Sequence, residues 1–162
     1  MKQVLVKAVV KAREFARAKH NKQLDDMGKS YFDAHIEQVV RVLQQVTNDE
    51  VMLAVGYLHD TIEDTDTTYQ ELLSEFGKDI ANLVMELTHD GQKDNKGYYF
   101  PRLVSKRAIV IKFADRISNL SRMESWNDKR QTQYLGKSKF WASDTLKPEI
   151  LSNLSSLKGR YG

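Results

Sequence analysis

Apolar residues recur at helical spacing along most of the chain, and no stretch shows the alternation of a strand. They occupy positions 4, 5, 8, 9, 12, 15 and 16, which predicts an amphipathic helix over Val4–Lys19. A second helix is expected over Tyr31–Val46, and a third from a cap at Asn48 or Asp49 to His59–Asp60. The pattern predicts an all-α fold.

The second half of the chain is helical by the same criterion. Thr67 and Thr68 each begin a capping box, so one of them should start a helix that ends at Gly77. The other expected elements are a helix over Ile80–Leu87, a mobile loop over His89–Gly97, a helix from about Tyr98, a helix over Ser105–Arg122, and one or two helices over Asp128–Leu157 divided near Pro148.

Composition narrows the class of protein. The chain has 162 residues, which suits a single domain over residues 1–162. It has no cysteine, so disulfides, iron–sulfur clusters and thiolate zinc sites are excluded. It also lacks a signal sequence and any run of about 18 apolar residues, so we expect a soluble, cytoplasmic protein without a membrane partner.

Charge is unevenly distributed around a net value of +3. Residues 1–24 hold seven Lys and Arg against one acid, residues 25–90 three against fifteen, and residues 91–162 fifteen against six. An acidic centre between basic arms suits a cation site that receives a phosphorylated small molecule. Nucleic acid is not an expected partner, because aromatic and basic residues do not interleave in any segment.

The acidic centre contains a concentrated group of ligand-type residues. An apolar helical run ends in His59-Asp60-Thr61-Ile62-Glu63-Asp64. If that helix continues, His59 lies one turn from Glu63, and Asp60 one turn from Asp64. Several ionisable groups beside a core are costly unless a cation or hydrogen bonds compensate, and a bound metal ion would do so.

Two more positions fit the same ion. His35 lies near the start of the second helix, and Asp115 interrupts the apolar face of Lys112-Phe113-Ala114-Asp115-Arg116-Ile117-Ser118-Asn119-Leu120. A His-Asp pair alone is a weak signal, and Asp115 has the alternative of a salt bridge to Lys112 or Arg116. His20 and His89 are more readily interpreted as hydrogen-bonded or surface residues than as ligands.

These residues together carry a family resemblance. His35, His59-Asp60 and Asp115 resemble the motifs of the HD-domain metal phosphohydrolases. The run from His59 to Thr65 is similar to the hydrolase domain of the RelA/SpoT proteins and to the small alarmone hydrolases, which remove the 3′-pyrophosphate of ppGpp. The resemblance covers about residues 5–125 and implies an HD-domain helical bundle, with residues 126–162 as a C-terminal helical extension.

The resemblance also implies roles for individual residues. One divalent ion, usually Mn²⁺, with Fe, Mg or Zn as alternatives, would be held by His35, His59, Asp60 and Asp115. Glu63 and Asp64 match the catalytic acid pair, and Asn119 matches a residue near the substrate. Lys22, Lys29, Lys112 and Arg116 are the cationic candidates for binding the phosphates of a nucleotide.

The chain departs from the family pattern at three points. Asp25-Asp26 stands where members usually have Arg-Lys, and Ile36 replaces the proline that follows the first ligand histidine. Tyr31 is one residue farther from His35 than the family pattern places it. A guanosine substrate then requires the two acids to meet the base edge while Lys22 or Lys29 meets the phosphates. The alternatives are an HD hydrolase of another nucleotide or phosphoester, and a catalytically silent nucleotide-binding module.

Overall fold

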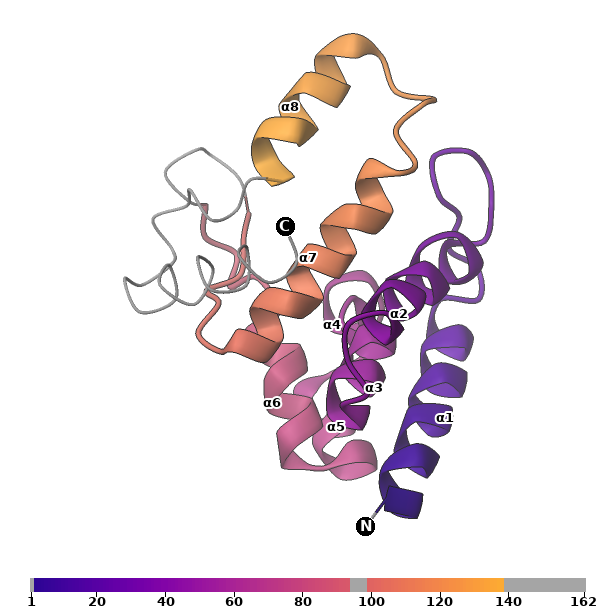
Figure 1. Cartoon of the computed structure of the whole chain (residues 1–162), viewed down its shortest axis with the longest axis vertical. Helices are drawn as coiled ribbons and strands as arrows, with labels where there is room; N and C mark the ends of the chain where they lie inside the picture. The colour runs from indigo at the N-terminus through magenta and orange to yellow at the C-terminus, as the bar shows by residue number, and fades with distance from the viewer. Residues whose placement is uncertain (1, 94–98, 139–162) are drawn as a thin grey trace.

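The computed structural model describes residues 2–93 and 99–138, and this part of the chain is all-α (Figure 1). Its elements are α1 (Lys2–Lys19), a π-helix (Phe32–Ile36), α2 (Glu37–Gln44), α3 (Glu50–Leu58), α4 (Thr61–Asp64), α5 (Tyr69–Phe76), α6 (Lys78–Glu86), α7 (Lys106–Leu120) and α8 (Asp128–Ser138). Outside the helices, the described residues form only isolated β-bridges, Leu24 with Ser30 and Lys93 with Tyr99. The predicted all-α class is confirmed.

Helix α3 lies at the centre of the packing. It contacts α1, α2, α6 and α7, and six of its nine residues are buried. Gly56 allows this closeness, because a Cβ atom there would lie 2.7 Å from Leu43 Cδ1 and 3.1 Å from Val40 Cγ2 on α2. The close approach of α2 and α3 brings the segments that carry His35 and His59 to the same side of the core.

Local capping explains where several helices begin. Asp49 caps α3 through a hydrogen bond from Met52 N, and Thr68 caps α5 by accepting from Glu71 N. Ser105 caps α7 in the same way, through Ala108 N. Gly77 ends α5 with a φ of 88°, a backbone conformation that favours glycine.

The ends of two helices set the positions of the ligand-type residues. The third helix ends at Leu58, next to its predicted end at His59–Asp60, and the chain restarts as α4 after Asp60, whose φ of −100° and ψ of 0° are not helical. The predicted helix over Tyr31–Val46 begins instead with the π-helix Phe32–Ile36. A π-turn accommodates an extra residue within a helix, which fits the longer spacing between Tyr31 and His35.

The prediction was wrong for residues 99–104, which are not helical as far as the structure describes them. The remainder of the expected loop over His89–Gly97 beyond residue 93, and the tail beyond residue 138 with Pro148, lie outside the described residues. None of the helices in the described ranges has the length and apolar character needed to span a membrane. The cytoplasmic location and the single domain over 1–162 stay predictions.

Candidate metal centre

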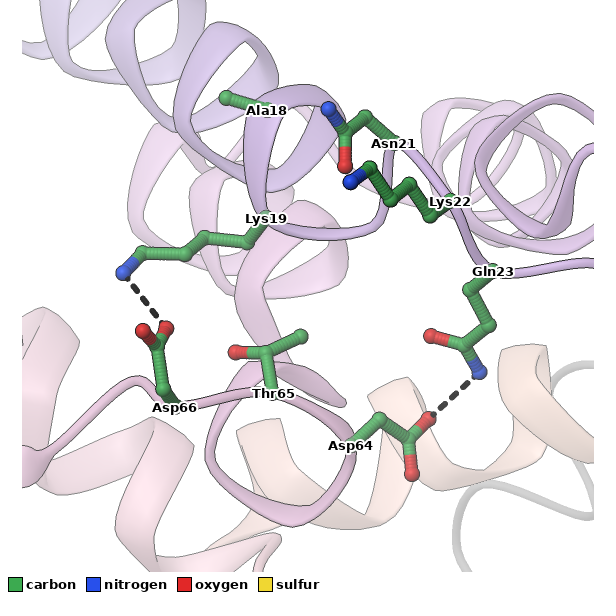
Figure 2. A pocket seen from close by; sticks show the side chains of 8 residues that line it. All are labelled: Ala18, Lys19, Asn21, Lys22, Gln23, Asp64, Thr65 and Asp66. Atoms are coloured by element: carbon green, nitrogen blue, oxygen red, sulfur yellow. Dashed lines mark hydrogen bonds and ion pairs between the residues drawn. The ribbon is translucent and has the colours of Figure 1, made fainter.

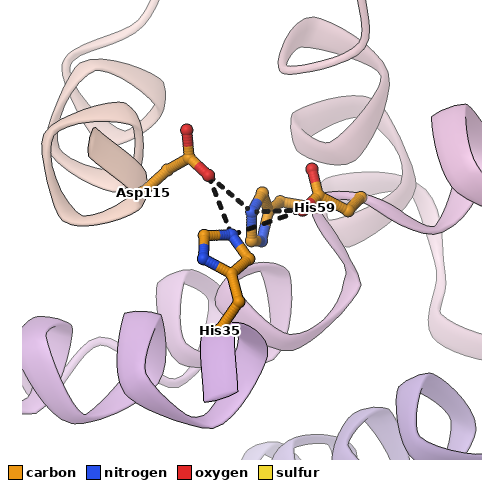
Figure 3. Close-up of side chains that lie close together, drawn as sticks. His35, His59 and Asp115 are labelled. Carbon is orange, nitrogen blue, oxygen red and sulfur yellow. Dashed lines mark hydrogen bonds and ion pairs between the residues drawn. The ribbon is translucent and has the colours of Figure 1, made fainter. Parts of the chain in front are cut away.

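His35, His59, Asp60 and Asp115 converge from three separate parts of the chain. One ligand atom from each lies within 4.8 Å of the others. Asp115 Oδ1 is 3.0 Å from His35 Nε2 and 3.2 Å from His59 Nε2, and dashed lines mark both contacts in Figure 3. Asp60 Oδ2 is 3.4 Å from His35 Nε2 and 3.2 Å from His59 Nε2. Two imidazole nitrogens and two carboxylate oxygens therefore face one point.

Hydrogen bonds at the far nitrogens orient both imidazole rings. His59 Nδ1 lies 2.7 Å from the carbonyl oxygen of Gly56, so this nitrogen carries the proton and donates. His35 Nδ1 lies 2.9 Å from Ser118 Oγ, which in turn donates to Gln38 Oε1 at 3.0 Å. Nε2 of each ring faces the cluster, and without its proton it is the nitrogen that would bind a metal ion.

The charges of the cluster compensate one another. Burial alone would lower the pKa of His59, but the charge of Asp60 and a hydrogen bond to Asp115 raise it well above its ordinary value. Burial opposes ionisation of Asp115, yet Lys112 and the two histidines hold its pKa well below the usual range. A divalent cation would replace protons in this environment, and the donor set of two imidazoles and two carboxylates suits such an ion.

The second oxygen of Asp115 faces two cations. Lys112 Nζ and Arg116 Nη1 each lie 3.5 Å from Asp115 Oδ2. The salt-bridge alternative and the metal-ligand interpretation are therefore compatible, because the two interactions use different oxygens. Both cations also pack over the ring of Phe100, at 5.4 Å and 5.6 Å from its centroid.

Glu63 and Asp64 lie on α4, next to the cluster. Glu63 Oε1 accepts a hydrogen bond of 2.8 Å from the backbone N–H of His89. Asp64 Oδ2 accepts one of 3.3 Å from Gln23 Nε2. Asp64 keeps contact with solvent, but partial loss of hydration and the nearby charge of Asp60 raise its pKa to about 6.

A family model of the HD domain matches residues 12–95, which are 84 of the 162 residues. The chain belongs to the HD-domain family. The matched segment contains three of the four residues of the cluster, and Asp115 on α7 supplies the fourth from outside it.

Individual relatives extend over more of this HD-domain chain. The guanosine-3′,5′-bis(diphosphate) 3′-pyrophosphohydrolase MESH1 of Xenopus tropicalis is 32% identical over 153 residues, which covers 86% of this chain and 83% of that protein. The MESH1 protein of Homo sapiens is 32% identical over 160 residues, with the same coverage of 86% and 83%.

A bacterial relative is much longer. The guanosine-3′,5′-bis(diphosphate) 3′-pyrophosphohydrolase of Aquifex aeolicus is 30% identical over 131 residues, and the match spans 76% of this chain but only 19% of that protein. Among solved structures, a metazoan orthologue of SpoT that hydrolyses ppGpp matches with a TM-score of 0.70 and 27% identity, and covers 82% of each chain.

A hollow of about 490 Å³ opens beside Asp64 in this HD domain (Figure 2). Lys22 and Lys19 line it, but Lys19 is paired with Asp66 at 2.8 Å, whereas Lys22 is exposed. Of the cationic candidates, Lys22 thus lines the same hollow as Asp64, an acid of the proposed pair. Lys29 is exposed in the turn closed by the Leu24–Ser30 bridge.

Asn119 is held in a network with α8. Its Nδ2 donates to Tyr134 Oη at 2.7 Å, and its Oδ1 accepts from Arg122 Nη2 at 2.8 Å. Arg116 Nη1 donates to the same Tyr134 oxygen at 2.9 Å. Two candidate substrate residues, Asn119 and Arg116, are thereby fixed by a tyrosine that the sequence pattern did not single out.

Asp25 and Asp26 have partners within the protein. Asp25 Oδ1 accepts hydrogen bonds from the backbone N–H groups of Met27 and Lys29, and its Oδ2 lies 3.4 Å from Arg122 Nη1. Asp26 Oδ2 accepts from Trp126 Nε1 at 2.7 Å and from Arg130 Nη2 at 2.8 Å. These contacts join the loop to α8 and to the segment before it, and the expected role of the two acids at a base edge stays a prediction.

Ser118, Gln38 and Tyr31 were missed as functional candidates. Ser118 and Gln38 orient His35, and Tyr31 Oη donates to Asp60 Oδ2 at 2.6 Å. Burial and the charge of Asp60 raise the pKa of Tyr31 well above its ordinary value, so the phenol stays a donor. The shifted spacing of Tyr31 was the one signal in the sequence, since serine and glutamine on helices carry none.

Proposed function

We propose that this HD-domain chain is a metal-dependent phosphohydrolase that removes the 3′-pyrophosphate of ppGpp-type alarmone nucleotides. The observation that carries the proposal is the match to proteins named for that activity over most of their length, 83% for the MESH1 protein of Xenopus tropicalis. The solved structure of the SpoT orthologue that hydrolyses ppGpp supports it at a TM-score of 0.70.

The proposed metal ligands are His35, His59, Asp60 and Asp115, and the proposed ion is Mn²⁺. The oriented Nε2 atoms and the four ligand atoms within 4.8 Å support this assignment. Oxygen and imidazole donors suit Mn²⁺, and the lack of cysteine argues against a thiolate-preferring ion. A divalent ion bound there would supply a Lewis acid that polarises a phosphoryl oxygen and acidifies water.

The protein side chains would handle the proton balance of the reaction. A water oxygen bonds to the phosphorus next to the 3′ oxygen, the bond between that phosphorus and the 3′ oxygen breaks, and a proton must reach the 3′ oxygen. Asp64, with a pKa near 6, suits both accepting and releasing a proton close to neutral pH. Glu63 has one oxygen held by His89 N and would orient the water with the other.

Cationic side chains would bind the phosphates. Lys112 and Arg116 lie along α7 next to Asp115, and they would bind a phosphoryl oxygen placed near the cluster. Lys22 at the hollow would bind charge on the side of Asp64. Asn119, with both ends of its amide hydrogen-bonded, would offer a fixed polar surface to the nucleoside.

A product analysis tests the proposal. Purified protein with Mn²⁺ is incubated with ppGpp, with its adenosine counterpart and with nucleoside triphosphates, and a Glu63→Gln variant serves as the control for contaminating hydrolases. We expect pyrophosphate and GDP from ppGpp. Turnover of another phosphoester alone would favour the second candidate, an HD hydrolase with a different substrate. The ion pairs of Asp25 with Arg122 and of Asp26 with Arg130 support this candidate. Nucleotide binding without any turnover would favour the silent module.

A further inference from the structure

Tyr31 contacts the cluster from outside it. Its hydroxyl donates to Asp60 Oδ2 at 2.6 Å. This is the same carboxylate oxygen that lies 3.4 Å from His35 Nε2 and 3.2 Å from His59 Nε2. A carboxylate oxygen has two lone pairs, so it can accept the phenol on one side and face a cation on the other.

The position of Asp60 in the chain does not hold its carboxylate by itself. Asp60 lies in the break between α3 and α4, and its side chain makes no hydrogen bond to cap α4. Its φ of −100° and ψ of 0° fall in the sparsely populated bridge region, where many active-site residues are found. The orientation of this carboxylate therefore depends on contacts from other elements.

Tyr31 is well placed to supply such a contact, because its own ring is fixed. The ring packs against His20 and His35, with centroid distances of 5.5 Å and 5.1 Å. The π-helix Phe32–Ile36 follows directly after it. Four positions separate Tyr31 from His35, a spacing at which two helical side chains lie on the same side, and the two rings are in contact.

We propose that Tyr31 is a positioning residue for the metal centre, whose hydroxyl holds Asp60 Oδ2 so that its free lone pair faces the point between His35 and His59. The inference rests on the proposed metal ligands but not on the substrate. Contacts of this kind to a ligand residue typically change metal affinity by about 10–100-fold when they are removed. Tyr31 does not bind the ion itself.

The test compares two variants that each delete one phenolic oxygen. Tyr31→Phe removes the bond to Asp60, and Tyr69→Phe removes the bond of Tyr69 Oη to Asn82 Oδ1 between α5 and α6. The Kd for Mn²⁺ is measured by titration of the metal-free proteins against a competing chelator. We expect the Kd of Tyr31→Phe to rise by about 10–100-fold, and that of Tyr69→Phe to match the wild type.

Melting temperatures of the metal-free proteins separate a positioning role from a purely structural one. We expect Tyr31→Phe and Tyr69→Phe to melt within a few degrees of each other, because each loses one side-chain hydrogen bond. An unchanged Kd in Tyr31→Phe, an equal rise in both variants, or a failure of Tyr31→Phe alone to fold would overturn the proposal. Metal binding that depends on Tyr31 in a protein that leaves ppGpp intact would refute the proposed function and leave this inference standing.

Discussion

Replacing Gly56 with alanine tests how closely α3 must approach α2. The new Cβ would lie 2.7 Å from Leu43 Cδ1 and 3.1 Å from Val40 Cγ2, well inside the usual carbon–carbon contact of about 3.5–4.0 Å. Leu43 and Val40 are 0% and 1% exposed, so neither can turn away without displacing other core side chains. Overpacking of this kind costs about 1–3 kcal/mol, and the upper end applies to so short a contact.

Alanine also improves helix propensity, which offsets about 1 kcal/mol of that cost. We therefore expect the free energy of unfolding of Gly56→Ala to fall by about 2 kcal/mol, which corresponds to a drop in Tm of roughly 4–8 °C for a chain of this size. Gly136→Ala in α8 is the matched control, because no atom lies within 4 Å of a Cβ at that position. It should gain about 0.5–1 kcal/mol.

Thermal and urea denaturation of the metal-free proteins measure both changes, and a Mn²⁺ titration measures the effect on the site. Because the Gly56 carbonyl accepts the hydrogen bond that orients His59, a shift of α3 should also weaken metal binding. A Gly56→Ala protein as stable as the wild type, alongside a stabilised Gly136→Ala, would refute the argument from close packing.

Three further predictions concern the site. His59→Ala and Asp115→Ala should each lose most of a metal content of about one ion per chain by elemental analysis, and full retention in both would contradict the proposed ligands. Glu63→Ala should keep its metal and Tm while turnover falls on the order of a hundredfold or more, whereas loss of the metal would make Glu63 a ligand. Folding raises the pKa of Asp64 to about 6, so the stability contributed by its protonation is present at low pH and is lost as pH rises through that value. We therefore expect the free energy of unfolding of Asp64→Asn, relative to that of the metal-free wild type, to rise by about 1 kcal/mol between about pH 4 and 7, after allowance for solvent screening. Urea unfolding at each pH measures this difference, and a difference that shrinks as the pH rises would contradict the prediction.

The helices that follow from local rules were predictable from the sequence. Asp49, Thr68 and Ser105 all cap helices, because a short polar side chain can accept a backbone N–H two or three residues ahead. The four ligand-type residues were also chosen from the sequence, and the structure brings them together. Their individual roles stay predictions.

Features that depend on distant contacts were not predictable in this way. The end of α3 lies close to its predicted place, but nothing local indicated that the chain would restart as α4 over Thr61–Asp64. Tyr134 reaches Asn119 from another helix, and Asp26 reaches Arg130 across more than a hundred positions. A single sequence records neither the approach of these segments nor the geometry that results.

The attachment of α8 has a consequence for how the molecule exchanges hydrogen with solvent. Among the described residues of α8, only Ser138 is buried, and hydrogen bonds and ring contacts of Tyr134 and Arg130 hold this helix. The ion pair between Arg130 and Asp26 has both side chains about half exposed, at 52% and 51%, and is therefore weakened by salt. Amides of α8 should exchange through local opening that salt accelerates, while amides of the buried α3 exchange only when the core unfolds.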